Sequence, residues 1–323
     1  MSGPQIDFAE LRFALVEAMK RVINLILKED LARLSASRDL QHAPKSLDDQ
    51  TREVDAHALK IIIDFLKTHL TATNALLVSE ENPVGEYIKS PDGLPNLLFI
   101  IDPIDNTDGA IHGGMPSSAI SVYCRSKATV IAAAVADPGL LRVYYADEET
   151  AAVRYSLHDN PGVSSGTELS PSKKEEVAGA YISIYTLKPQ RLLLAAKAQR
   201  LLDALGDAGR VECLGGAISL CRVAAGHIDA CIEFAKGFQA YDLFPGAYVL
   251  NRAGGVCQKP DGMEPVELSL KISNQTEIPN SLRRRQIFIG AGTGKLYGRI
   301  QSLLLKDDIG FENQPLLPGS SAE

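Results

Sequence analysis

Acidic residues crowd one short segment of this chain, LLFIIDPIDNTDG, where Asp102, Asp105 and Asp108 fall within seven residues. No Lys or Arg occurs between Leu94 and Tyr123 to offset their charge. Oxygen ligands without a local base favour a hard divalent cation, Mg²⁺ first, and two such ions could clamp a phosphoryl group during hydrolysis. The alternative is that these acids cap a turn and a helix start. The segment alone does not decide between the two hypotheses.

Three further acids extend the candidate set. Glu80 follows the apolar run ALLV, Asp242 opens the helix-like run YDLFPGAYVLNRAGG, and Asp55 lies near the start of a predicted helix. A carboxylate at a helix start faces the positive end of the helix dipole. Taken singly, each acid fits a helix cap or a solvated position; together with the aspartates they favour a metal site.

The motif DPIDNT at 102–107 resembles the DPIDGT signature of the inositol monophosphatase superfamily. Other pieces match that superfamily in the same order: REVD at 52–55, SEE at 79–81, LGGAISLCRVAAGHIDACIE at 214–233, YDLFPGAYVLNRAGG at 241–255 and IFIGAGTGKL at 287–296. The similarity runs from the first predicted helix to about residue 306, which is nearly the whole chain.

The resemblance implies an Mg²⁺-dependent, lithium-sensitive phosphomonoesterase with two or three Mg²⁺ per site. The superfamily includes fructose-1,6-bisphosphatase-like and bisphosphate nucleotidase members, so the implied substrate is a small phosphorylated polyol, sugar or nucleotide. Hydrolysis would use a metal-activated water. The resemblance also implies a homodimer.

Carried over by position, the resemblance assigns four sets of residues. The metal ligands would be Glu80, Asp102, the Ile104 carbonyl, Asp105 and Asp242. Asp55 and Thr107 would orient the attacking water, with Glu80 as the third catalytic residue. The backbone N–H groups of Asn106 and Thr107 would hold the phosphate, as oriented amides do. The substrate-binding residues would be Asp105, Gly216, Ala217 and Glu233.

The chain also departs from the superfamily pattern. Asn106 replaces the usual Gly, although Asn adopts the left-handed conformation more readily than most residues. Gly109 and Ala110 replace Asn and Phe, and Tyr241 replaces Trp. Glu233 precedes Asp242 by two residues more than expected. The changes at Asn106, Gly109 and Ala110 motivate an alternative hypothesis, a non-catalytic member acting as a binding or assembly protein.

Hydrophobic periodicity predicts the elements that must position these residues. We expect helices at 8–26, 52–69, 190–205, 217–225, 243–253 and 295–305, and strands at 75–78, 97–101, 121–124, 130–135, 141–145, 153–155, 180–185, 211–214, 230–234 and 286–289. Pro103 lacks an amide hydrogen, so we expect its strand to end there.

The polar stretch at 156–179 is the best candidate boundary between two parts of the chain. We predict an N-terminal α+β domain at 1–166 with most metal ligands, a C-terminal α/β domain at 167–306 that completes the site with Asp242, and a loose tail at 307–323. Alternating helices and strands in the second half indicate an α/β arrangement. The resemblance implies a layered αβαβα sandwich.

Composition narrows the function class. The 323 residues carry a formal net charge of −7, which argues against a nucleic-acid partner but allows an anionic substrate held through metal ions. The longest apolar run, Leu97–Ile101, is too short to span a membrane. The N-terminus lacks signal-peptide features. Five cysteines form no CxxC pair, and we expect reduced thiols in a cytoplasmic protein.

Two other motifs suggest alternative binding functions. GAGTGK at 290–295 invites a nucleotide-loop interpretation and, with it, an oxidoreductase, but it fits neither GxGxxG nor a P-loop; a Gly-rich strand-to-helix turn is favoured. The basic run Arg283-Arg284-Arg285 could contact a substrate phosphate or a partner, although short charge runs usually lie in solvent. Histidines are scattered without HxxxH spacing, which argues against zinc.

Overall fold

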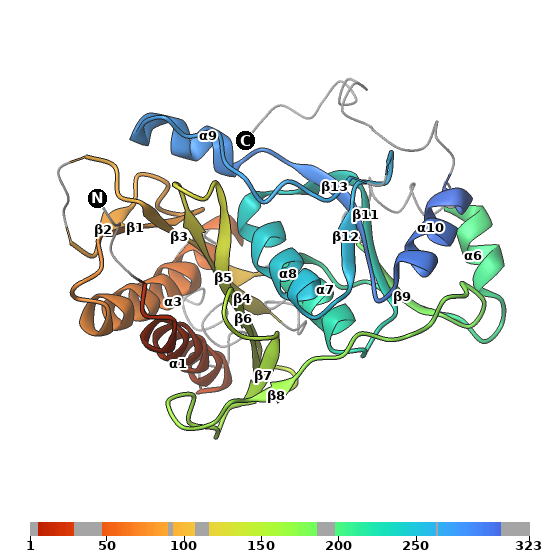
Figure 1. Ribbon diagram of the computed structural model, residues 1–323, viewed down its shortest axis with the longest axis horizontal. Coiled ribbons are helices and arrows are strands. Elements are labelled where there is room, and N and C mark those ends of the chain that lie inside the picture. Colours follow the sequence, from red (N-terminus) through yellow and green to blue (C-terminus); the bar gives the residue numbers. More distant parts are fainter. Residues whose placement is uncertain are drawn as a thin grey trace, which may run out of the picture.

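The computed structural model describes residues 6–28, 47–89, 93–106, 116–185, 198–262 and 264–304, with the side chains of 47–53 left out. Helices and two β-sheets alternate in five layers, which makes the fold an α+β layered sandwich (Figure 1). Thr107, Gly109 and Ala110 of the acidic loop lie outside the described residues, as does the first half of the helix expected at 190–205.

The first sheet has eight strands in the order β2-β1-β3-β4-β5-β6-β7-β8. Only β1 and β3 pair in parallel; the remaining pairs are antiparallel. Its strands are β1 (Ala75–Ser79), β2 (Glu86–Tyr87), β3 (Leu97–Asp105), β4 (Ser117–Cys124), β5 (Thr129–Asp137), β6 (Arg142–Asp147), β7 (Val153–Ser156) and β8 (Thr167–Glu168).

The second sheet has five strands in the order β10-β9-β11-β13-β12. β9 pairs in parallel with β10 and β11, whereas β13 is antiparallel to β11 and β12. These strands are β9 (Tyr181–Ile184), β10 (Arg210–Glu212), β11 (Ala230–Phe238), β12 (Val256–Gln258) and β13 (Gln286–Ala291).

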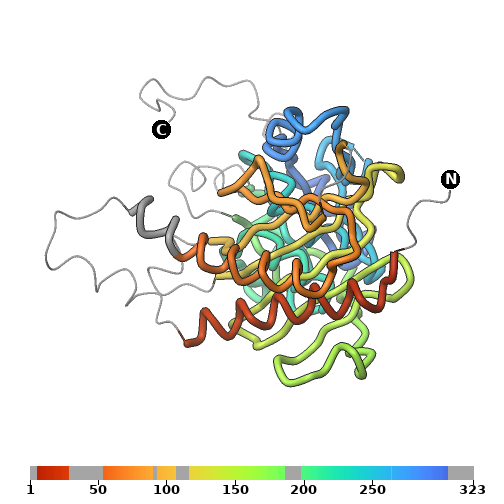
Figure 2. The backbone as a smooth tube through the Cα atoms, turned by 90° about the vertical axis from the view of Figure 1, so that its left-hand side faces the viewer, coloured from red at the N-terminus to blue at the C-terminus, as the bar shows by residue number. Residues whose placement is uncertain are grey.

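Three helix layers bury the faces of these sheets. α1 (Phe8–Lys28) and α3 (Leu47–His69) run side by side over one face of the first sheet (Figure 2). α7 (Gly216–Ala224) and α8 (Ala240–Arg252) lie between the sheets, and α6 (Gln199–Leu205) and α10 (Gly294–Leu303) cover the outer face of the second. Asp7 caps α1 by accepting the N–H groups of Ala9 and Glu10 at 2.9 and 3.1 Å, as Asp does at an N-cap. Among the described helices, none is both long and apolar enough to cross a bilayer.

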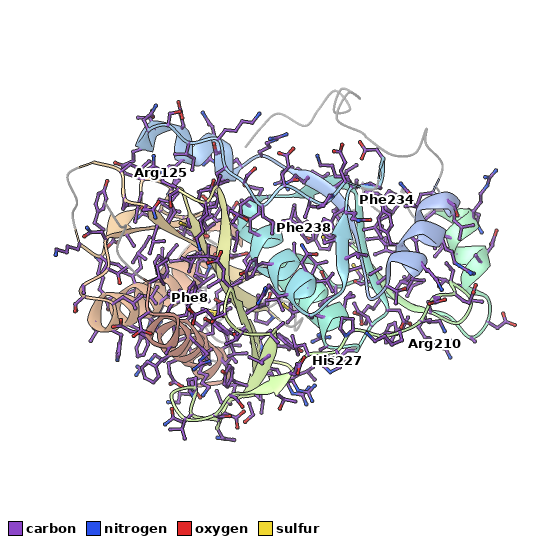
Figure 3. The ribbon with its side chains drawn as sticks, viewed as in Figure 1. Phe8, Arg125, Arg210, His227, Phe234 and Phe238 are labelled. Atoms are coloured by element: carbon purple, nitrogen blue, oxygen red, sulfur yellow. The ribbon has the colours of Figure 1, made fainter. Side chains whose placement is uncertain are left out.

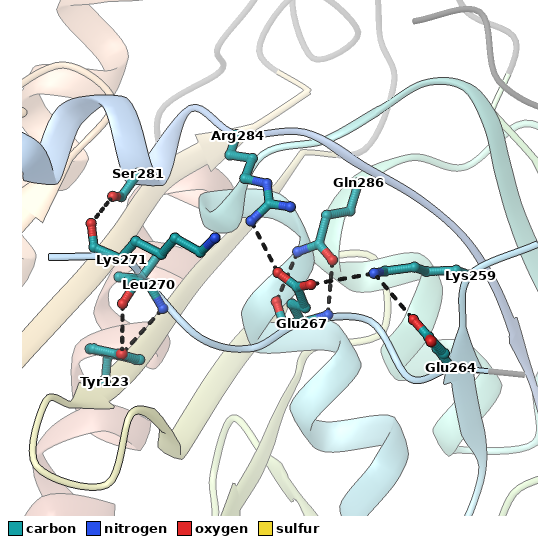
Figure 4. Close-up of polar contacts among 9 residues, drawn as sticks. All are labelled: Tyr123, Lys259, Glu264, Glu267, Leu270, Lys271, Ser281, Arg284 and Gln286. Atoms are coloured by element: carbon teal, nitrogen blue, oxygen red, sulfur yellow. Dashed lines mark hydrogen bonds and ion pairs between the residues drawn. The ribbon is translucent and has the colours of Figure 1, made fainter. Parts of the chain in front are cut away.

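The connection from β12 to β13 carries two short helical segments, η1 (Gln275–Glu277) and α9 (Ile278–Leu282). Polar contacts hold it to both sheets (Figure 4). The Tyr123 hydroxyl on β4 donates to the Leu270 carbonyl at 3.2 Å and accepts the Leu270 N–H at 3.1 Å. Glu267 accepts from Lys259 at 3.4 Å and from Arg284 at 3.0 Å. The middle residue of the basic run therefore pairs with an acid of its own connection.

One expectation about the acidic segment is wrong: β3 does not end before Pro103. It continues to Asp105, which pairs with Ser117, and the register shifts between Asp102 and Asp105. A proline is tolerated where a β-bulge interrupts the ladder, because no amide donor is needed there. The irregularity lets one strand deliver both aspartates.

The two sheets divide within the predicted polar boundary stretch. β8 extends the first sheet to Glu168 and β9 begins the second at Tyr181. The first sheet thus runs two residues past the proposed break at 166. The division into two domains stays a prediction.

Candidate metal centre

The acidic residues meet at one edge of the first sheet. β1 and β3 run in parallel, and Ser79 is level with Ile101, so Glu80 and Asp102 emerge side by side at their carboxyl ends. Asp242 approaches from the first turn of α8, where its Oδ2 accepts the Gln239 N–H at 3.4 Å. The Tyr241 hydroxyl donates to the Ser79 carbonyl at 3.2 Å, which fixes α8 against the end of β1.

Three carboxylates form a compact ligand set. One oxygen each from Asp102, Asp105 and Asp242 lies within 4.8 Å of the others, the single such group within the described part of the chain. Asp102 is buried, and the other two are partly exposed. Glu80 is exposed outside this group, but its charge acts on all three aspartates. The structure therefore brings three of the five predicted metal ligands together, and Glu80 lies close enough for its charge to act on them.

Burial and mutual repulsion disfavour the charged forms of these acids. Burial, followed by the neighbouring carboxylates, raises the pKa of Asp102 well above its usual value. Burial is also the main reason that the pKa of Asp105 rises to about 6 and that of Asp242 to about 7. Arg285 is the cation that opposes the shift at Asp242. A divalent cation would relieve this repulsion, so the residues present fit a hard metal ion.

These shifts predict a pH-dependent response to Mg²⁺. The folded, metal-free protein holds protons that the unfolded chain releases near pH 4, so its stability falls as pH rises from there toward the pKa values of about 6 and 7. Mg²⁺ must displace the same protons. We expect Mg²⁺ to raise the melting temperature more at pH 7.5 than at pH 5.5, measured by scanning calorimetry. An equal increase at both values, or a larger one at pH 5.5, would contradict the assignment.

Backbone geometry at the start of α7 fits closely around Asp105. The Ala217 N–H donates to the Asp105 carboxylate, and the Ser117 hydroxyl donates to its Oδ2 at 3.1 Å. Gly216 has a positive φ of 71°, and a Cβ at that position would lie 1.3 Å from Asp105 Oδ2. Gly216 and Ala217, which the resemblance assigns to substrate binding, therefore lie directly against a candidate metal ligand.

Asn106 directly follows β3 and adopts the left-handed conformation, with φ of 63°. Asn therefore adopts the backbone conformation that glycine would adopt at lower steric cost. Asp55 is buried in α3, and the Ile104 side chain is buried in the hydrophobic core that α1 and α3 share with the first sheet. The roles of Asp55, Asn106 and the Ile104 carbonyl stay predictions, and Thr107 lies outside the described residues.

Glu233 occupies a structural position in the second sheet. Its Oε1 accepts the N–H groups of Ala235, Lys236 and Gly237 at 2.9, 2.9 and 3.1 Å, where the β11–β13 register shifts. The two extra residues that separate Glu233 from Asp242 in the sequence lie next to this bulge, which the Glu233 carboxylate stabilises. A role in substrate binding stays a prediction.

Replacing Glu233 tests these two roles separately. Glu233→Ala leaves three amides without their acceptor, and we expect a loss of about 3 kcal/mol in the free energy of unfolding. Glu233→Gln keeps an oxygen acceptor and should lose only about 1 kcal/mol. Urea denaturation measures both. Equal stability of the alanine variant would refute the structural role, and a raised KM in the glutamine variant would support the substrate role.

Three contributors to this site were missed by sequence reasoning. The hydroxyl of Ser117 binds Asp105, that of Ser118 donates to the Asp102 carbonyl at 3.2 Å, and Gln239 caps α8. Arg285 donates to the Gly237 carbonyl at 2.9 Å.

The GAGTGK segment forms the strand-to-helix turn that the sequence favoured. The Thr293 hydroxyl accepts the Leu296 N–H and so caps α10.

Comparisons with known proteins show the family and the fold of this chain. The model of the inositol monophosphatase family matches residues 7–297. "Nus factor SuhB" of Pseudomonas aeruginosa is 28% identical over 66% of this chain and 73% of its own length. The inositol-1-monophosphatase of Mycobacterium leprae is 30% identical over 53% of this chain and 55% of its own. In fold, the extragenic suppressor protein suhB of Bartonella henselae superposes with a TM-score of 0.65 at 18% identity, covering 91% of this chain and 97% of that one.

Proposed function

This chain belongs to the inositol monophosphatase family and is a phosphatase, and we propose that it is an Mg²⁺-dependent phosphomonoesterase for a small phosphorylated polyol, sugar or nucleotide. The observation that carries the proposal is the cluster of Asp102, Asp105 and Asp242, whose oxygens lie within 4.8 Å of one another. Burial is the main reason that the pKa values of these three carboxyl groups are raised, and a bound cation would favour their charged forms. We further propose two or three Mg²⁺ per site and a homodimer, both from the family resemblance.

The chain's own residues prepare the site in two ways. Asp102, Asp105 and Asp242, with Glu80 beside them, would hold the ions, while Ser117 and the Ala217 N–H fix the orientation of the Asp105 carboxylate. The left-handed turn at Asn106 would present backbone N–H groups to the phosphate. When bound, Mg²⁺ supplies a nucleophile at neutral pH and offsets charge on the transferring phosphoryl group. Asp55, which is buried in α3, would orient the attacking water together with Thr107, as the resemblance implies.

The test is release of inorganic phosphate from a panel of phosphomonoesters with Mg²⁺ and with EDTA. The panel contains inositol monophosphate, fructose 1,6-bisphosphate, adenosine 3′,5′-bisphosphate and NADP⁺. We expect one compound to be turned over and its turnover to stop in EDTA, which also names the substrate class. Release that EDTA does not affect would contradict the metal-dependent mechanism.

A non-catalytic role is the second candidate, because one relative is named a Nus factor and Asn106 replaces the family's glycine. Asn106→Gly discriminates between the two, since glycine adopts the observed φ of 63° without steric cost. A large gain in rate would mean that the native loop is impaired. A loss of rate would mean that the Asn106 side chain suits the true substrate.

A further inference from the structure

A group of basic side chains lies at the far end of α7 from Asp105. This cationic cluster comprises Arg142 on β6, Arg154 on β7, Arg222 on α7 and His227 just after it; Figure 3 labels His227 near that end of the helix. Tyr144 on β6 packs against α7 and α8, and it lies directly opposite Arg154 on the neighbouring strand β7. Because side chains two apart on a strand share a face, Arg142 and Arg154 both lie on the face that α7 covers.

The cationic cluster contains more positive than negative charge. Arg222 Nε and Nη2 lie 3.2 and 3.3 Å from the two oxygens of Asp137, which is almost fully buried. Arg142 Nη1 lies 3.5 Å from His227 Nε2. The Arg154 side chain makes no hydrogen bond or ion pair with other residues that the structure describes, although it is half-buried.

Other acids do not balance the cluster. Glu212 acts on Arg222 from the side of β10, where its Oε2 accepts from the Tyr181 hydroxyl at 2.9 Å. Burial, followed by Arg142, Arg154 and Arg222, lowers the pKa of His227, so the imidazole stays neutral near pH 7. The net positive charge is notable in a chain of net charge −7.

The cluster is separate from the metal centre but shares a helix with it. Asp105 pairs with Ser117 on β4, and Asp137 on β5 pairs with Arg142 on β6, so Asp105 and Arg142 are three strand spacings apart, about 15 Å. α7 begins at Gly216, against Asp105, and ends at Ala224. Its nine residues span about 13 Å.

We propose that the cationic cluster is a second anion site, which binds the phosphate group of a small molecule independently of the metal centre. Arginine guanidinium groups bind phosphate oxygens through pairs of N–H donors. The partly buried position of the arginines strengthens such contacts relative to bulk water. The ligand is either inorganic phosphate or a small phosphomonoester; the net negative charge of the chain disfavours a polynucleotide.

Calorimetric titration of inorganic phosphate into the full chain tests this site, once with Mg²⁺ and once with EDTA. EDTA removes phosphate binding that depends on metal ions, so we expect one binding event to persist in EDTA. Arg154→Gln, which breaks no described contact, should weaken that event at least about tenfold, and Arg142→Gln with Arg154→Gln should abolish it. Arg210→Gln is the control, because among the described residues the Arg210 side chain bonds only backbone carbonyls of residues 207 and 209, and it should leave binding unchanged.

Proton NMR of the histidine rings gives a second readout. Bound phosphate should raise the pKa of His227, whose signal is identified by its loss in His227→Gln. Titration of adenosine 5′-monophosphate in parallel distinguishes the two sources, since tighter binding of the ester indicates a phosphorylated metabolite and equal binding indicates free phosphate. Absence of binding in EDTA, or binding unchanged in the double variant with a normal melting temperature, would overturn the proposal. Neither result depends on whether the metal centre turns over a phosphomonoester.

Discussion

Asp105→Asn is expected to reduce Mg²⁺-dependent phosphate release by about a thousandfold, because the site loses a charged ligand that contributes several kcal/mol to holding and using the metal. Asp105 is central to the site: it lies in the carboxylate cluster, accepts from Ser117 and Ala217, and contacts Gly216. The asparagine is nearly isosteric, so the fold should persist. Steady-state phosphate release and calorimetric Mg²⁺ binding measure the effect.

Asp64→Asn is the matched control for that substitution. Asp64 is an exposed acid on α3 that pairs with Lys60 at 2.8 Å, and surface pairs of this kind contribute little to stability. The control variant should keep the wild-type rate and Mg²⁺ affinity. An undiminished rate in Asp105→Asn would remove the carboxylate cluster from the mechanism.

Gly216→Ala is expected to abolish most activity without removing any functional group. The added Cβ would lie 1.3 Å from Asp105 Oδ2, and φ of 71° is strained for alanine. The carboxylate or the start of α7 must therefore move. Because a displacement of about 1 Å at a catalytic site can lower a rate about a hundredfold, we expect a loss of at least that size together with weaker Mg²⁺ binding.

Gly298→Ala separates this local effect from a general effect of replacing glycine. Gly298 lies in α10, and an added Cβ there would meet no atom within 4 Å. We expect normal activity and slightly higher stability, since alanine favours a helix. If both glycine variants kept full activity and Mg²⁺ affinity, the close contact between Gly216 and Asp105 would have no role in the site.

Sequence patterns were sufficient to predict the elements with strong periodicity. The helix at Phe8–Lys28 and the apolar strand that delivers Asp102 follow from residue spacing alone, because one buried face dominates their composition. Short elements were missed. β2, β8 and β12 have two or three residues each, too few to establish a period, and they exist because neighbouring strands offer a pairing edge.

The site was partly predictable for a similar reason. Strand ends and helix starts indicate where carboxylates are presented, so Asp102 and Asp242 could be proposed together, although 140 positions separate them. The passage of β3 through Pro103 could not be predicted, because it depends on pairing between Asp105 and Ser117 across a register shift. Likewise, the hydrogen bonds from three backbone N–H groups to Glu233 depend on a bulge in β11, which no local sequence pattern predicts.

If Asp102, Asp105 and Asp242 form a catalytic metal centre, the rate of phosphate release must depend on Mg²⁺ concentration differently in the wild type and in Asp242→Asn. We expect saturable activation of the wild type. In Asp242→Asn, at least about tenfold more Mg²⁺ should be needed for half-maximal activation, since one charged ligand is lost. Turnover that is independent of Mg²⁺, or identical activation curves for the two proteins, would contradict the assignment of these aspartates as a metal centre.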